Sequence, residues 1–200
     1  MKKQIIGLFL VAASLVSNGA AAQKIRLAEG DLSPLAGEKE LNVEFDYKDM
    51  KVGKMTETEY VNKKRDEYNK KEAGKGDNWV KAWEDDRETR FEPKFLQSFN
   101  QFSGGMTAGP LASAKYTMLV KTTFTEPGYN IVVHRVNAQV NLDATIVETA
   151  NRNKVVAKIT VEKSPGGAWF DNDFDTGQRI TEAYNNAGMS LAGFIRSKAH

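Results

Sequence analysis

Apolar and polar residues alternate strictly from Asn137 to Ile146, which is the pattern of a strand with one face in the core. The same period returns from Val155 to Val161, after a turn-forming stretch at 150–153. Two such runs joined by a short turn predict a β-hairpin. The residues expected to point inward are Ala138, Val140, Leu142, Ala144 and Ile146 on the first strand and Val155, Ala157, Ile159 and Val161 on the second.

Three further strands follow from the same reasoning. Residues 116–124 are rich in β-branched and aromatic side chains and end at the turn sequence Glu126-Pro127-Gly128. Residues 40–47 alternate, and residues 24–28 form a shorter alternating run that suits the edge of a sheet. The inward side chains of the 40–47 strand are expected to be Leu41, Val43, Phe45 and Tyr47.

Helical spacing dominates the segment between these strands. Thr56 and Glu59 form a capping box that predicts a surface helix ending near Glu72. Asp77 or Asn78 is expected to cap a second helix. A third helix begins near Pro93 and carries a core face of Phe95, Leu96, Phe99 and Phe102.

The remaining parts of the chain are a loop and a long helix. Residues 103–110 contain three glycines and predict a mobile loop. Residues 176–198 carry an apolar stripe at helical spacing and predict the last helix.

The order of these elements predicts an α/β fold, with α+β as the alternative. The long helical connection between the strands at 40–47 and 116–124 allows a parallel crossover, whereas the later strands are antiparallel. We therefore expect a mixed, partly antiparallel sheet with helices packed on it and the C-terminal helix covering the hairpin. Residues 23–200 are expected to form a single domain.

Residues 1–22 have the features of a secretory signal peptide. Lys2 and Lys3 precede the uncharged run Ile5–Val16, and Ala20-Ala21-Ala22 offers the small residues that a signal peptidase requires. The run is shorter than the roughly 20 apolar residues of a membrane-spanning helix. We expect cleavage after Ala22, with an uncleaved anchor as the alternative, and a mature protein that is periplasmic or secreted and not stably inserted in a membrane.

Charge and cysteine usage restrict the function further. Two of the 28 lysines and arginines lie in the leader, so the remaining 26 equal the 26 acidic residues in number. Because the mature chain carries no net positive charge, we do not expect it to bind nucleic acid. The absence of cysteine excludes disulfides, thiolate metal sites and a lipid-anchored N-terminal cysteine.

The usual catalytic motifs are missing from the sequence. It holds two histidines, His134 between strands and His200 at the end, and has no nucleophile elbow, phosphate loop or metalloprotease helix. No catalytic residue is therefore assigned, although a carboxylate-based hydrolase stays open because acidic residues are plentiful.

An acidic cluster before the last helix is the one candidate metal site. Asp171, Asp173 and Asp175 alternate, and Glu182 stands at the twelfth position, as a calcium loop requires. The glycine falls at the seventh position instead of the sixth. The favoured interpretation is that Asp173 or Asp175 caps the helix and that no cofactor binds.

Trp79 and Trp83 lie four residues apart on a predicted helix. Such a pair serves either as core or as a platform for stacking a sugar or a partner. These two residues are the candidate ligand-binding residues.

The second half of the chain resembles a known periplasmic domain. The strand ending at Pro127-Gly128, the alternating hairpin 137–162, the Gly166-Gly167 loop and a C-terminal helix with Gly188 and Gly193 are similar to the α/β domain of curli-channel and penicillin-binding-protein-activator lipoproteins. In general style the chain also resembles small exported proteins of the Bacteroidetes. The anchoring cysteine and the membrane hairpin of the lipoproteins are absent.

The resemblance implies a non-enzymatic domain that binds other proteins of the envelope. We therefore expect a protein-interaction or assembly module with an envelope protein as partner. The alternatives are an extracytoplasmic binder of a small ligand or glycan and, third, the carboxylate-based hydrolase.

Overall fold

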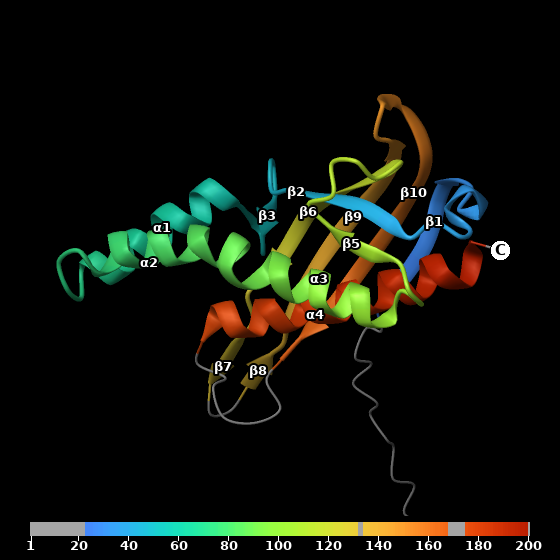
Figure 1. Ribbon diagram of the computed structural model, residues 1–200. Helices are drawn as coiled ribbons and strands as arrows, with labels where there is room; N and C mark the ends of the chain where they lie inside the picture. The colour runs from blue at the N-terminus through green and yellow to red at the C-terminus, as the bar shows by residue number, and fades with distance from the viewer. Residues whose placement is uncertain (1–22, 132–133, 168–174, 200) are drawn as a thin grey trace, which may run out of the picture.

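A mixed sheet of eight strands forms the centre of the molecule in the computed structural model, which describes residues 23–131, 134–167 and 175–199 (Figure 1). The path through the sheet is β1-β10-β9-β6-β2-β5, and the short β3 pairs with β4 and β6. A separate ribbon joins β7 to β8. The strands are β1 (Lys24–Gly30), β2 (Glu40–Asp46), β3 (Lys51–Val52), β4 (Met55–Thr56), β5 (Thr107–Gly109), β6 (Tyr116–Glu126), β7 (Tyr129–Ile131), β8 (His134–Val136), β9 (Ala138–Glu148) and β10 (Asn151–Gly166).

The sheet is mixed because β2 runs parallel to β6 and β5, whereas β6, β9, β10 and β1 are antiparallel neighbours. This arrangement confirms the predicted α/β class, including the crossover from β2 to β6. The helices are α1 (Glu57–Asn69), α2 (Lys75–Asp86), η2 (Arg87–Phe91), α3 (Glu92–Phe102) and α4 (Thr176–Lys198), with a short 3-10 turn, η1, at Ser33–Leu35.

The β9–β10 hairpin confirms the alternation read from the sequence, with one exception. All five inward residues predicted for β9 are buried, as are Ala157, Ile159 and Val161 on β10. Val155 is 39% exposed, so its inward placement was wrong. The register shifts between Val155 and Ala157, and such a bulge reverses the side to which the preceding residues point.

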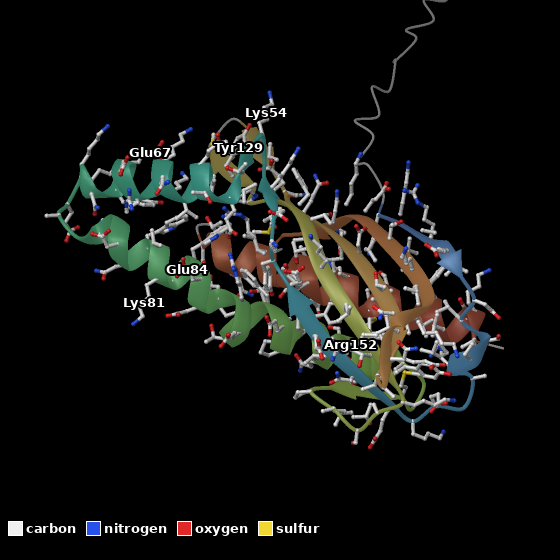
Figure 2. The ribbon with its side chains drawn as sticks, turned by 90° about the horizontal axis from the view of Figure 1, so that it is seen from above. Lys54, Glu67, Lys81, Glu84, Tyr129 and Arg152 are labelled. Atoms are coloured by element: carbon white, nitrogen blue, oxygen red, sulfur yellow. The ribbon has the colours of Figure 1, made fainter. Side chains whose placement is uncertain are left out.

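One face of the sheet is covered by α3 and α4, and no helix of the described residues covers the other, which we call the open face (Figure 2). On the covered face the Tyr184 and Thr122 hydroxyls lie 2.6 Å apart in a buried hydrogen bond. The open face carries polar rows such as Lys121 opposite Asp143, which in turn lies opposite Thr160. The C-terminal helix thus covers the hairpin as predicted.

Helices α1 and α2 form a hairpin that extends beyond the sheet (Figure 1). The predicted capping box is present, since Thr56 Oγ1 accepts from Glu59 N and the Glu59 carboxylate accepts from Thr56 N. The predicted cap of α2 was wrong: Gly74, with a φ of 79°, is the N-cap residue, and the helix begins at Lys75. A left-handed backbone at this tight corner favours glycine over the expected Asp77 or Asn78.

The second and third predicted helices are one continuous helical rod from Lys75 to Phe102. A π-helical turn, η2, joins α2 to α3 without a break. Such a turn inserts an extra residue and changes which side of the rod faces the core. The rod therefore packs against α1 at one end and against α4 and the sheet at the other.

Two loop assignments also need correction. The expected loop at 103–110 contains β5, which adds to β2 through three residue pairs. His134 begins strand β8 instead of lying between strands. None of the helices in the described part of the chain combines the length and the apolar character needed to cross a membrane.

Candidate functional site

An open groove lies at the C-terminal end of β2, where the strand approaches the helical rod. One part has a volume of about 470 Å³ and is lined by Phe45 and Tyr47 on the sheet side and by Glu84, Asp85, Arg87, Glu88, Thr89 and Glu92 on the rod. An adjoining part of about 610 Å³ extends past Tyr47 toward the Lys48–Lys51 loop and the start of α1. Phe45, Tyr47 and Arg87 line both parts, and we call the whole the β2 groove.

The groove forms because β5 is too short to cover β2. Thr107, Ala108 and Gly109 pair with Glu40, Leu41 and Asn42, and the pairing then stops. The four following residues of β2, 43–46, have no strand on that side within the described residues. Backbone N–H and C=O groups on such an edge are free to pair with another strand.

Arg87, from the π-helical turn, divides the two parts of the groove. Its guanidinium lies 4.6 Å from the centre of the Tyr47 ring and forms an ion pair with Glu57. Glu57 also accepts a hydrogen bond of 2.7 Å from Trp83 Nε1. These contacts connect α1, the rod and the end of β2, so the groove has a fixed shape.

Tyr47 and Glu92 lie in the deeper part of the groove. The Tyr47 hydroxyl is buried and lies close to the Glu92 carboxylate and the Tyr184 hydroxyl. Burial raises the pKa of Tyr47 well above the usual value, with further contributions from Tyr184 and Glu92, so the hydroxyl stays protonated. Burial also raises the pKa of Glu92, and the nearby Glu88 contributes to this shift.

The outer wall of the groove is acidic. Glu84, Asp85 and Glu88 are exposed on the rod, and no ion pair involves them within the described part of the chain. Arg87, the one basic residue of this part of the groove, is already paired with Glu57. The rod-side wall of this part therefore carries uncompensated negative charge, whereas the 48–51 loop brings two lysines to the adjoining part.

The two predicted ligand-binding tryptophans lie inside the α1–α2 hairpin. Trp83 is 6% exposed, and its ring stacks on Trp79 with centroids 5.5 Å apart. Tyr60 packs against both indoles, and Tyr68 packs against Trp79. Trp83 thus has no free ring face for a sugar, and the pair stabilises the hairpin against Tyr60 and Tyr68.

The predicted calcium cluster is described only in part. Asp171 and Asp173 lie outside the described residues. Asp175 caps α4, accepting from Gln178 N at 3.2 Å, and pairs with Arg90 at 2.9 Å. Glu182 accepts from the side-chain amides of Gln178 and Asn185. No group of three or more potential metal ligands occurs within the described residues.

Sequence reasoning missed the groove residues. The run 84–90 shows only a charged helical surface, and nothing in it signals a π-helical turn that brings Arg87 to Tyr47. One signal was available: Tyr47 continues the apolar face of β2 beyond the end of the strand.

No protein-family model and no curated protein matches this sequence. Among solved structures, the chain is similar to two structures of the PelC dodecamer from Paraburkholderia phytofirmans, one of which is of a variant. Their TM-scores are 0.39 and 0.38, with 12% and 11% identity, and each match covers 82% of this chain and 96% of the other. A DUF330 protein of Xanthomonas campestris, XCC0632, matches at a TM-score of 0.42 with 11% identity, over 80% of this chain and 85% of the other.

With TM-scores below 0.5, these likenesses carry no conclusion about the function or the assembly of this chain. These three structures are of PelC and a DUF330 protein and do not test the resemblance to curli-channel and penicillin-binding-protein-activator lipoproteins, which stays a prediction.

Proposed function

We propose that this chain is an exported, non-enzymatic module of the bacterial envelope that binds a partner protein in the β2 groove. The observation that carries the proposal is the free edge of β2, which ends inside an open groove. A strand edge recognises a polypeptide through backbone hydrogen bonds, and this is a recurring mode of protein recognition. The leader-like residues 1–22 support an extracytoplasmic setting. The balanced charge of the mature chain favours a protein partner over a nucleic acid.

Site-specific photocrosslinking in the native cell tests the proposal. A benzophenone amino acid at Thr89, which is exposed on the rod side of the groove, should capture one partner protein reproducibly. The same amino acid at Asp143, exposed on the open face of the sheet, is the matched control. Equal capture of the same proteins from both positions would contradict the proposed docking site.

The setting is tested separately by the mature N-terminus. Protein recovered from the periplasm or the medium should begin at Gln23 when sequenced. An intact Met1 on protein retained in the cytoplasm would refute export.

A carboxylate-based hydrolase is the second candidate, because Glu92 has a raised pKa and lies beside further carboxylates in a groove. Its discriminating test is a screen of chromogenic glycosides and esters. Activity that Glu92→Gln abolishes, while the variant unfolds like the parent protein, would favour the enzyme over the binding module. The glycan-platform alternative is weakened because Trp83 is buried.

A further inference from the structure

The β2 groove has two properties that together restrict what it binds. They are the length of the free strand edge and the uncompensated charge of the wall on the rod side. The two properties come from different residues, and together they describe a segment of polypeptide. The inference below rests on the proposed function and specifies the partner's chemistry.

The free edge accommodates a short extended segment. Residues 43–46 of β2 continue as a strand after β5 has ended. At about 3.3 Å per residue, four residues offer roughly 13 Å of edge. In a strand added to this edge, every second residue directs its N–H toward β2, and its side chains alternate between the two faces of the sheet.

The acidic wall determines which side chains that segment carries. Side chains on the helix-covered side of an added strand point toward the rod, where Glu84 and Glu88 lie exposed and unpaired within the described residues and Glu92 lies deeper. Lysine or arginine at alternate positions would supply the missing positive charge. Acidic segments would be repelled by the same wall.

The base of the groove supplies an apolar contact. Phe45 lines both parts of the groove. The Tyr47 hydroxyl has no exposed surface and lies against the Glu92 carboxylate, so a bound segment meets the ring of Tyr47 and not its hydroxyl.

We infer that the groove binds an extended segment of the partner protein with Lys or Arg at every second position, which adds as a strand to the free edge of β2. The observation specific to this inference is the juxtaposition of an unpaired strand edge with unpaired carboxylates. Neither feature alone specifies both an extended backbone and a positive charge.

Selection from a phage-displayed library of random 12-residue peptides against the full mature chain tests the inference. We expect enriched peptides with basic residues at alternate positions. Binding of a synthetic selected peptide should weaken about three- to tenfold for each of Glu84→Gln and Glu88→Gln and should fall steeply with salt. Glu67→Gln is the matched control, because Glu67 is an exposed carboxylate on α1 outside the groove (Figure 2).

Backbone N-methylation of the same peptide tests strand addition directly. Methylation of the residues whose N–H faces β2 should reduce affinity at least tenfold, whereas methylation of the alternate residues should have little effect. Hydrogen exchange should show new protection at those of residues 43–46 whose N–H groups face the free edge and not β6. Failure to enrich any peptide, enrichment without basic residues, or equal effects of both methylation patterns would overturn the inference.

Failure of this inference can be distinguished from failure of the proposed function. If Thr89 captures a partner in cells but the captured segment is helical or acidic, strand addition is refuted and the binding module stands. If Thr89 captures no specific partner, the binding module itself is refuted.

Discussion

The guanidinium of Arg87 lies 4.6 Å from the centre of the Tyr47 ring, and the same guanidinium pairs with Glu57. Tyr47 follows β2, Arg87 belongs to the π-helical turn, and Glu57 begins α1. One side chain therefore connects the sheet, the rod and the projecting hairpin at the β2 groove. These contacts help to fix the shape of the groove.

Arg87→Met should destabilise the protein by about 1–3 kcal/mol, because a half-buried, charge-assisted hydrogen bond and a cation–π contact are lost. The variant also leaves Glu57 without its cation, which adds to the cost. Urea unfolding followed by tryptophan fluorescence measures the change. Lys81→Met, on an exposed site of the same rod (Figure 2), should change stability by less than about 0.5 kcal/mol. Equal losses for both variants would refute the structural role of Arg87.

Glu92→Gln should make the protein more stable at pH 7 and leave it nearly unchanged in acid. Burial raises the pKa of Glu92 in the folded state, so the stability associated with its neutral form is present below the unfolded pKa near 4.5 and is lost as pH rises through the folded value. Glutamine lacks the ionisation and keeps that stability. Thermal unfolding across pH 3 to 8 measures the difference, and a variant less stable than the parent at pH 7 would contradict the assignment.

Gly188→Ala and Gly193→Ala should have opposite effects, although both positions lie within α4. A Cβ atom at Gly188 would lie 2.4 Å from the backbone oxygen of Phe95, so α3 and α4 would have to separate, at a cost of about 1–3 kcal/mol or more. At Gly193 nothing lies within 4 Å of the added atom, and alanine should stabilise the helix by up to about 1 kcal/mol. Parallel urea titrations compare the two, and changes of the same sign would contradict this packing of α3 on α4.

Asp175→Ala should cost on the order of 1 kcal/mol through loss of the α4 cap, whether or not calcium is present. Partial burial acts to raise the pKa of Asp175, but its contacts with Arg90 and Gln178 outweigh burial and lower it. Its stabilising effect should therefore be present above the ordinary carboxyl pKa and be lost as pH falls through the lowered value. A calcium-dependent rise in melting temperature that Asp173→Ala abolishes would support a metal site instead.

The sequence determined the elements whose pattern repeats over many residues. Alternation identified β2, β9 and most of β10, and helical spacing identified α3 and α4. Residue types at short spacing also predicted the Thr56 capping box and an aspartate cap of α4, because each capping residue bonds to a residue three positions later. These features depend on neighbours in the chain, so the chain alone predicts them.

Tertiary structure decided the groove and the role of the tryptophans. The early end of β5 and the packing of Tyr60 on α1 against Trp79 and Trp83 on α2 depend on residues from separate elements meeting in space. A change of one residue in helical phase or strand register alters which side chains face the core, and no local pattern records it. The meeting of Tyr47 with Arg87, forty positions later, could therefore be known only from the fold.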